Sequence, residues 1–221
     1  MAEDELLDYC DADGAWLGVA PRREVHARGL WHRTLHLWLA TPEEGGSLLY
    51  QLRSAGTANW PGLLDVSVAG HLLAGETYRE AMRESREEIG IAVPFDATIP
   101  LGERREQHPD SEGGWNREFQ GIHIARLDPA WGNFEATDHE AAGLFWIGFE
   151  AGMRLHRGDV ATIACDALII EDGRARAVRR EVALSDFVPR GDYYVRIHQI
   201  AARMIQGEPA GMLIEAYGQS D

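Results

Sequence analysis

The chain has few cysteines and no long apolar segment, which excludes several classes of protein. Only Cys10 and Cys165 occur, far apart in 221 residues, so neither a disulfide framework nor a zinc knuckle is expected. Residues 1–5 are acidic, whereas a secretory signal begins with basic residues and continues with an apolar run. No apolar stretch approaches the ~20 residues that a membrane-spanning helix needs. We therefore expect a cytoplasmic protein without a membrane partner.

Basic residues are also scarce. There are 21 Lys and Arg against 36 Asp and Glu, and the formal net charge is -15. A chain this acidic repels the phosphate backbone of nucleic acid, so we expect no nucleic-acid partner. A small phosphorylated ligand stays possible, because a bound metal ion reverses the local charge. The length and the 45% hydrophobic content predict a single domain over residues 1–221; a homodimer is possible.

Strand-like and helix-like segments are intermixed, and no internal repeat is present. Large apolar and aromatic residues predict strands over residues 5–10, 34–40, 47–53, 63–69, 118–126 and 143–148, the second and third as a hairpin. A strand pair, 162–171 and 174–183, surrounds the turn signal Asp172-Gly173, and residues 192–206 have helical periodicity. These elements predict an α/β (α+β) layered domain, with the C-terminal strand pair and helix at about 159–207.

The clearest predicted helix covers residues 77–89. Thr77 and Glu80 have capping-box spacing at its start, and Gly90 suits its end. Residues three and four apart share a helix face, so Glu84, Glu87 and Glu88 converge and repel one another by about 0.2–0.5 kcal/mol per pair. A hard divalent cation with oxygen ligands would relieve this repulsion. A solvated helix face of mixed charge is the alternative interpretation.

Glycines around the helix favour the metal-site interpretation. Gly70 and Gly75 precede the helix and Gly90 follows it, which indicates backbone that approaches a ligand closely. The stretch from Gly70 to Ile91 resembles the Nudix box, a loop–helix–loop written G-x5-E-x7-R-E-U-x-E-E-x-G-U, with U a bulky aliphatic residue. The matching residues are Gly70, Glu76, Arg83, Glu84, Glu87, Glu88, Gly90 and Ile91.

The resemblance to Nudix hydrolases implies a fold, a reaction and a metal site. The implied fold is an α/β/α sandwich with a mixed β-sheet. The implied metal, Mg²⁺ or Mn²⁺, is held by Glu84, Glu87 and Glu88 with a backbone carbonyl near Ala69 or Gly70, and it acts on a small-molecule diphosphate. The resemblance also implies that a salt bridge between Arg83 and Glu76 holds the loop and helix in register.

The sequence departs from the box at two positions. Six residues, 77–82, separate Glu76 from Arg83, where the pattern has seven. Removing one residue rotates the preceding helical turn by about 100°, so the placement of Glu76 and Gly70 against the carboxylates is open. Ser85 also stands where the pattern has an aliphatic residue, which weakens the expected packing of the helix on the sheet.

Upstream residues resemble a narrower branch that includes isopentenyl-diphosphate isomerase. The similar segments are 29–33, 34–40, Arg53 and 61–71, and with the box they cover residues 5–148. These isomerases use a cysteine immediately before the Gly-His pair, where this chain has Ala69, which carries no transferable proton. Of their later pair of acids only Glu118 is present, and Asn116 stands at the companion position. Isomerisation is therefore disfavoured, whereas hydrolysis by the box carboxylates is not.

Other residues are candidates with two interpretations each. Glu118 is either a general base or extra metal ligand, or an exposed strand-edge residue. His71 and His32, with His26, suit a metal or phosphate site or a structural role. Arg53 suits bidentate phosphate binding or a surface salt bridge.

Three functions follow from these residues. The leading hypothesis is a Mg²⁺-dependent diphosphate hydrolase, in which Glu84 or Glu118 is the base and Arg83 supports the catalytic carboxylates. The second is an isomerase acting on a prenyl diphosphate. The third is a non-catalytic ligand-binding domain, which the shortened spacing before Arg83 would favour. We expect substrate specificity to come from residues 103–117 and 127–142, which lie outside the box.

Overall fold

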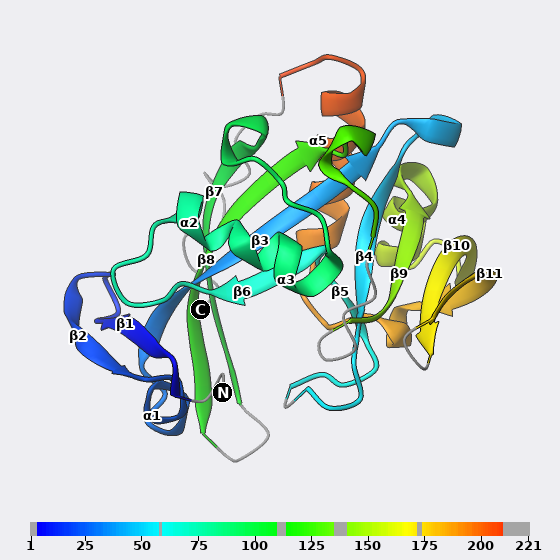
Figure 1. The fold of residues 1–221 in the computed structure, drawn as a ribbon. Helices are drawn as coiled ribbons and strands as arrows, with labels where there is room; N and C mark the ends of the chain where they lie inside the picture. The colour runs from blue at the N-terminus through cyan, green and yellow to red at the C-terminus, as the bar shows by residue number, and fades with distance from the viewer. Residues whose placement is uncertain (1–3, 58, 110–113, 135–140, 172–173, 210–221) are drawn as a thin grey trace.

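The computed structural model describes residues 4–57, 59–109, 114–134, 141–171 and 174–209, and its framework is one 11-stranded sheet (Figure 1). The strands are β1 (Leu6–Cys10), β2 (Trp16–Pro21), β3 (Trp31–Thr41), β4 (Ser47–Arg53), β5 (Leu64–Asp65), β6 (Val68–His71), β7 (Ile99–Pro109), β8 (Trp115–Arg126), β9 (Ala141–Gly148), β10 (Thr162–Glu171) and β11 (Arg174–Ala183). Their order is β11-β10-β9-β4-β3-β1-β2, with β5 beside β4, β6 and β8 beside β3, and β7 beside β8.

The central strand β3 makes the sheet mixed. It runs parallel to β8 from Trp31↔Arg117 to Ala40↔Arg126 and antiparallel to β6. The other strand pairs are antiparallel. Successive side chains of a strand point to opposite faces, so β3 supplies both layers of the core. The mixed sheet of the predicted fold class is confirmed.

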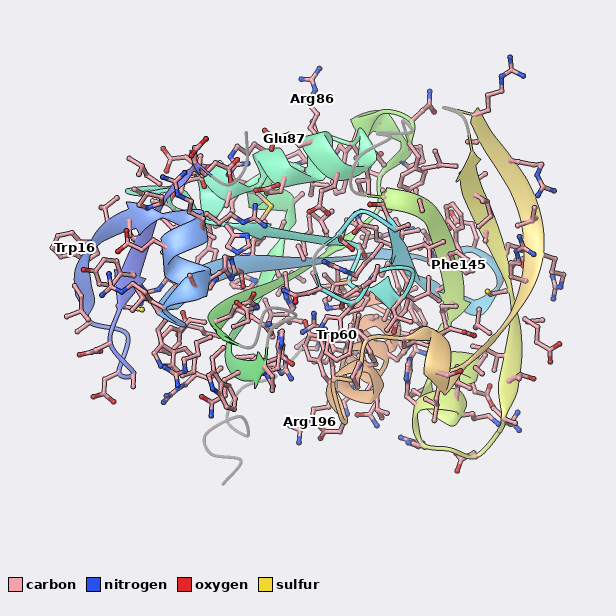
Figure 2. All side chains as sticks on the ribbon, turned by 90° about the horizontal axis from the view of Figure 1, so that it is seen from below. Trp16, Trp60, Arg86, Glu87, Phe145 and Arg196 are labelled. Carbon is pink, nitrogen blue, oxygen red and sulfur yellow. The ribbon has the colours of Figure 1, made fainter. Side chains whose placement is uncertain are left out.

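Helices cover both faces of this sheet, as Figures 1 and 2 show. On one face α2 (Tyr78–Ala81) and α3 (Arg83–Ile89) lie over Leu35, Leu37 and Leu39 of β3. On the other face α4 (Phe149–His156) and α5 (Tyr193–Ile205) pack on Trp38 and Ala40. The short helix α1 (Arg22–Ala27) follows β2 directly. These layers give the α/β/α arrangement that the resemblance implied.

Several predicted elements need correction. The strands predicted at 34–40 and 47–53 pair only at Ala40↔Leu48 and Thr41↔Ser47, because β4 continues along β9 while β3 continues along β6 and β8. The strand predicted at 63–69 is divided into β5 and β6. Much of the expected specificity loop 103–117 is strand β7 and the start of β8. The predicted turn at 172–173 lies outside the described residues.

Four elements were not predicted: β2, α1, β7 and α4. Strand β7 is mostly exposed and rich in charged residues, so it lacks the apolar alternation by which strands are recognised. The predicted helix over 77–89 is interrupted at Met82, which separates α2 from α3. Among the described residues, no helix is long and apolar enough to cross a membrane.

The half-buried His156 and the buried His198 lie among the aromatic residues between α4, α5 and β4. The His156 ring centroid is 4.7 Å from that of Phe187 and 4.8 Å from that of Tyr194. Tyr50 Oη lies 3.1 Å from His198 Nε2. No described residue forms a hydrogen bond with the buried His156 Nε2. Burial lowers the pKa of His156 to about 4, because a charged imidazolium would lose its solvation there.

This shift predicts that acid destabilises the fold. In the unfolded chain His156 binds a proton near pH ~6.5. The free energy of unfolding that neutral His156 contributes is therefore fully present above that pH and is lost as the pH falls towards 4. Between about pH 7.5 and about pH 5, the His156→Phe variant should lose about 2 kcal/mol less of its free energy of unfolding than the parent does. Urea unfolding of both proteins at the two pH values measures this difference, and equal losses would contradict it.

Candidate metal-binding site

The centre of the site is the contact between Gly70 of β6 and Glu84 of α3. A Cβ atom built on Gly70 would lie 2.2 Å from Glu84 Cδ and 2.3 Å from its Cγ. Glycine at this position therefore leaves the space that the Glu84 carboxylate occupies. Glu84 is thereby held in a largely buried position, with 9% of its surface exposed.

The three box glutamates have different partners. Glu84 Oε1 and Glu87 Oε2 each accept a hydrogen bond of 2.8 Å from Arg83 Nη1. Glu88 Oε2 accepts one of 2.8 Å from Gln51 Nε2 and another of 3.2 Å from the Ala69 backbone N–H. Glu84 and Glu88 are buried, whereas Glu87 lies on the outer side of the helix layer (Figure 2). The carboxylates therefore share a helix, but Arg83 stands between two of them.

Arg83 also joins the helix to the preceding loop. Its Nε donates to Glu76 Oε1 at 2.8 Å, and its Nη2 donates to Glu76 Oε2 at 3.2 Å and to the His71 carbonyl at 3.3 Å. Burial alone would lower the pKa of Arg83, but the bond to Glu76 and the charges of Glu84 and Glu87 raise it above its usual value. The salt bridge that the resemblance implied is present despite the shortened spacing.

The donor atoms of α3 fit a hard divalent cation. Glu84, Glu87 and Glu88 offer only carboxylate oxygens, which Mg²⁺ and Mn²⁺ prefer. The cradle that Gly70 leaves open holds Glu84 against β6, and Glu88 lies against Ala69 of the same strand. A cation at these carboxylates would lie beside the backbone of residues 69–70 and would replace the charge that Arg83 now supplies.

Three histidines form a second cluster on the opposite face of β6. Ligand atoms of His26, His32 and His71 lie within 4.8 Å of one another, and the structure describes no other such group of three His, Cys, Asp or Glu. The Nε2 atoms of His26 and His71 are 3.1 Å apart, and the rings of His32 and His71 are stacked at 5.1 Å. Burial lowers the pKa of both His32 and His71, which favours the neutral imidazole that binds metals.

Glu118 lies beside the histidine cluster and away from α3. It is paired in register with His32, and it accepts hydrogen bonds from Asn116 Nδ2 at 2.6 Å and Gln120 Nε2 at 2.7 Å. Burial would raise the pKa of Glu118, but the positive charge that His32 and His71 carry when protonated and the hydrogen bond from Gln120 lower it. The carboxylate is partnered and only partly exposed, in contrast to the exposed strand-edge alternative.

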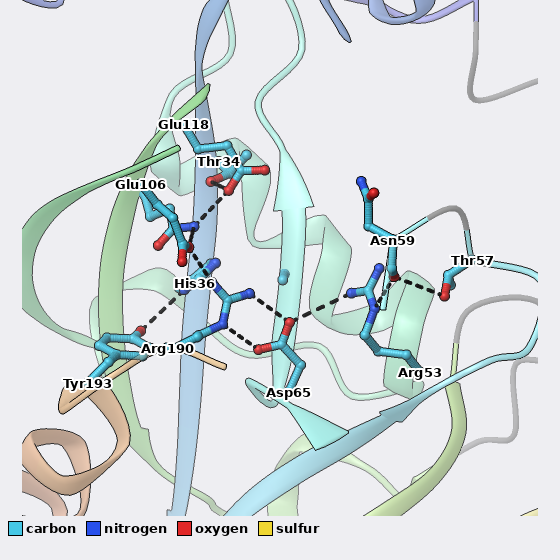
Figure 3. A network of polar contacts seen from close by, with 12 residues as sticks. Thr34, His36, Arg53, Thr57, Asn59, Asp65, Glu106, Glu118, Arg190 and Tyr193 are labelled. Atoms are coloured by element: carbon cyan, nitrogen blue, oxygen red, sulfur yellow. Dashed lines mark hydrogen bonds and ion pairs between the residues drawn. The ribbon is translucent and has the colours of Figure 1, made fainter. Parts of the chain in front are cut away.

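A buried polar network connects this face to the C-terminal segment (Figure 3). Arg190 donates to both carboxylate oxygens of Asp65, at 2.8 and 2.7 Å, and also contacts Glu106. Arg53 reaches Asp65 at 3.8 Å and donates to the Asn59 carbonyl at 3.0 Å. Burial would raise the pKa of Asp65, but Arg190 outweighs burial and lowers it. Arg53 therefore has a protein carboxylate as its neighbour.

Gln51 and Arg190 were not predicted as site residues from the sequence. Gln51 is a buried polar residue within the apolar strand β4. A polar residue in an apolar strand was the one feature of the sequence that could have indicated a role for it. Arg190 follows Phe187-Val188-Pro189, and its partners are 125 and 84 residues earlier in the chain. Such long-range pairs leave no periodic pattern in a sequence.

We predict that Arg190→Met destabilises the protein by about 3 kcal/mol, because it removes the bidentate partner of the buried Asp65. Asp65 keeps only the more distant Arg53, at 3.8 Å, whereas Glu106 keeps Arg104 at 2.6 Å. Arg196→Met is the matched control, since Arg196 bridges Asp192 on the exposed side of α5 and such pairs contribute about 0–1 kcal/mol. Denaturant unfolding measures both. Equal losses in the two variants would show that the buried network stabilises the protein no more than an exposed ion pair does.

Comparison with known proteins agrees with this geometry. Residues 31–162 match the family model of the NUDIX domain. An uncharacterized Nudix hydrolase from Clostridium acetobutylicum is 29% identical over 197 residues, covering 88% of this chain and 95% of the relative. An isopentenyl-diphosphate Delta-isomerase from Corynebacterium efficiens is 30% identical over 129 residues, covering 57% of this chain and 67% of the relative.

Solved structures show the same fold. The crystal structure of a Deinococcus radiodurans protein matches with a TM-score of 0.52 and 26% identity, covering 67% of this chain and 86% of that one. The family match covers more than half of the chain and includes β6, α2 and α3. The chain therefore belongs to the Nudix hydrolase family.

Proposed function

We propose that this Nudix hydrolase is metal-dependent and cleaves the diphosphate bond of a nucleoside diphosphate derivative or a related organic diphosphate. The observation that carries the proposal is the Gly70–Glu84 contact, which keeps a carboxylate buried against β6. Burying a carboxylate costs free energy unless it is paired, and Arg83 pairs with Glu84 at 2.8 Å in this structure. The carboxylate oxygens of Glu84, Glu87 and Glu88 do not form a group within 4.8 Å of one another among the described residues, so a divalent cation would bind after Arg83 releases Glu84 and Glu87.

The chain's own residues have distinct roles in this proposal. Glu84, Glu87 and Glu88 would hold Mg²⁺ or Mn²⁺, with the backbone at Gly70 alongside. The bound cation would polarise a phosphoryl oxygen and lower the pKa of water. Arg83 and Glu76 position the carboxylates. Either Glu84 or Glu118 would take the proton from the attacking water, and the two lie on opposite faces of β6.

The isomerase alternative lacks a proton donor at the corresponding position. Ala69 has none, and Cys10 Sγ donates to the Trp31 carbonyl at 3.4 Å. Burial raises the pKa of Cys10, so its thiol is a poor acid. Cys165 lies on β10, near the far edge of the sheet. Hydrolysis is therefore the function that these residues support best.

The decisive experiment is phosphate release from a panel of nucleoside diphosphate derivatives and prenyl diphosphates, with and without Mg²⁺. We expect Mg²⁺-dependent turnover, reduced about 100-fold or more in Glu87→Gln, because the variant loses one metal ligand. Glu150→Gln on α4 is the matched control and should leave turnover unchanged, since Glu150 is exposed on the opposite side of the sheet.

Two results would overturn the hydrolase proposal. Interconversion of prenyl diphosphate isomers without phosphate release would support the isomerase. No turnover on any compound, with no Mg²⁺ binding by calorimetry, would support the non-catalytic ligand-binding domain.

The histidine cluster supports a second ligand position. We propose that His26, His32 and His71 bind either a transition metal or a phosphate of the substrate, with Glu118 beside them and Arg53 on the neighbouring strand β4. Three imidazole nitrogens within 4.8 Å of one another suit Zn²⁺ or Mn²⁺ better than Mg²⁺.

We expect a transition metal in the purified protein by mass spectrometry, and its loss in His26→Ala. His108→Ala is the control, because His108 lies on β7 outside the cluster. If the parent holds no transition metal but His26→Ala raises KM for the diphosphate, the phosphate role is supported instead. An unchanged KM together with no metal would leave the histidines as structural residues.

A further inference from the structure

The interruption of the box helix is a tightened turn. At the interruption the backbone N–H of Ser85 donates to the Met82 carbonyl at 3.1 Å, whereas in α2 the N–H of Ala81 donates to the Thr77 carbonyl at 2.9 Å. The Ser85 bond joins residues three apart, as in a 3₁₀-helix, which rises ~2.0 Å per residue where an α-helix rises ~1.5 Å. The turn between α2 and α3 is thus tighter than the α-helices on either side of it.

Ser85 secures this turn with its side chain. Its hydroxyl donates to the Met82 carbonyl at 2.7 Å and accepts from the Val93 backbone N–H at 3.1 Å. The residue is completely buried. Serine hydroxyls that bond to a carbonyl of the preceding turn tighten and bend helices. An aliphatic residue here would leave the buried Val93 N–H without this acceptor, at a cost of about 1–3 kcal/mol.

We propose that Ser85 is a positioning residue that compensates for the one-residue shortening between Glu76 and Arg83. Losing one helical residue removes ~1.5 Å of rise and ~100° of rotation. The break at Met82 recovers part of this rise and rotation, because the Ser85–Met82 bond there has the spacing of a 3₁₀ turn, which rises and rotates more per residue than an α-helix. The two departures from the box pattern are thus one coupled change.

The contacts on either side of Ser85 show what the turn positions. Immediately before it, Arg83 reaches Glu76 and Glu84 packs on Gly70. One turn later, Glu88 accepts from the Ala69 N–H. A helix rotated by one residue could not make all three contacts together. This inference rests on the proposed function in one respect, since it assigns the positioned carboxylates to a metal.

The test is a double-variant cycle on the full chain. One variant is Ser85→Leu, the second has one alanine inserted between Met82 and Arg83, and the third combines both. Calorimetry measures the dissociation constant for Mn²⁺, and thermal unfolding measures Tm. Each single change should weaken Mn²⁺ binding about tenfold, the size usual for residues that support metal ligands. The combined variant should recover to within about threefold of the parent.

A buried serine with only a structural role is available as a control. The Ser67 hydroxyl donates to the Leu49 carbonyl at 2.5 Å and accepts from the Leu39 N–H at 2.9 Å, and the residue is also fully buried. Ser67→Ala and Ser85→Ala should lower Tm similarly, because each loses two hydrogen bonds to the backbone. Only Ser85→Ala should also weaken Mn²⁺ binding.

Each outcome decides the inference. Additive losses in the combined variant would overturn the compensation, and unchanged Mn²⁺ affinity in Ser85→Ala would reduce Ser85 to a structural residue. If the Ser85→Leu variant does not fold, Ser85→Ala replaces it in the cycle, alone and combined with the alanine insertion. A parent that binds no Mn²⁺ would refute the proposed metal site. The Tm values of the cycle would then still show whether the two departures are coupled.

Discussion

The rest of the site depends on the close approach of α3 to β6 at Gly70. A Cβ atom there would overlap the end of the Glu84 side chain, so the carboxylate would have to leave its position against β6. Its hydrogen bond with Arg83, which also contacts Glu76 and the His71 carbonyl, would be disturbed with it. The missing Cβ atom therefore leaves room for the Glu84 carboxylate at the point where strand, helix and loop meet.

Strand β6 separates two sets of groups with different chemistry. Carboxylates and Arg83 lie on the side of α3, whereas imidazoles and Glu118 lie on the side of α5. The alternation of a strand produces this separation, because Gly70 and His71 are consecutive and point to opposite faces. Oxygen donors suit hard cations and nitrogen donors suit softer ones, so the two faces of the strand offer different ligand atoms.

The buried polar network of Asp65, Glu106 and Arg190 holds the C-terminal segment against the sheet on the side of α5. Asp65 precedes β6, Glu106 lies on β7, and Arg190 connects them from the segment before α5. Taking these charges out of water is costly, and pairing recovers the cost only in good geometry. The bidentate contact of Arg190 with Asp65 has that geometry, and it ties the last helix to the strands that carry the site.

The sequence by itself determined the box residues, most strands and the layered fold class, because these follow from local spacing and periodicity. Glu84, Glu87, Glu88 and their flanking glycines could be identified from their separations along one short segment. Tertiary structure alone decided that Glu118 belongs with the histidines, that Arg190 pairs with Asp65, and that Ser85 supports a break at Met82. The first two contacts join residues that are far apart in the sequence and meet only in the folded sheet, and the third depends on where a shortened helix is interrupted. Local sequence patterns do not predict such contacts, because the packing of all the layers together decides which residues meet.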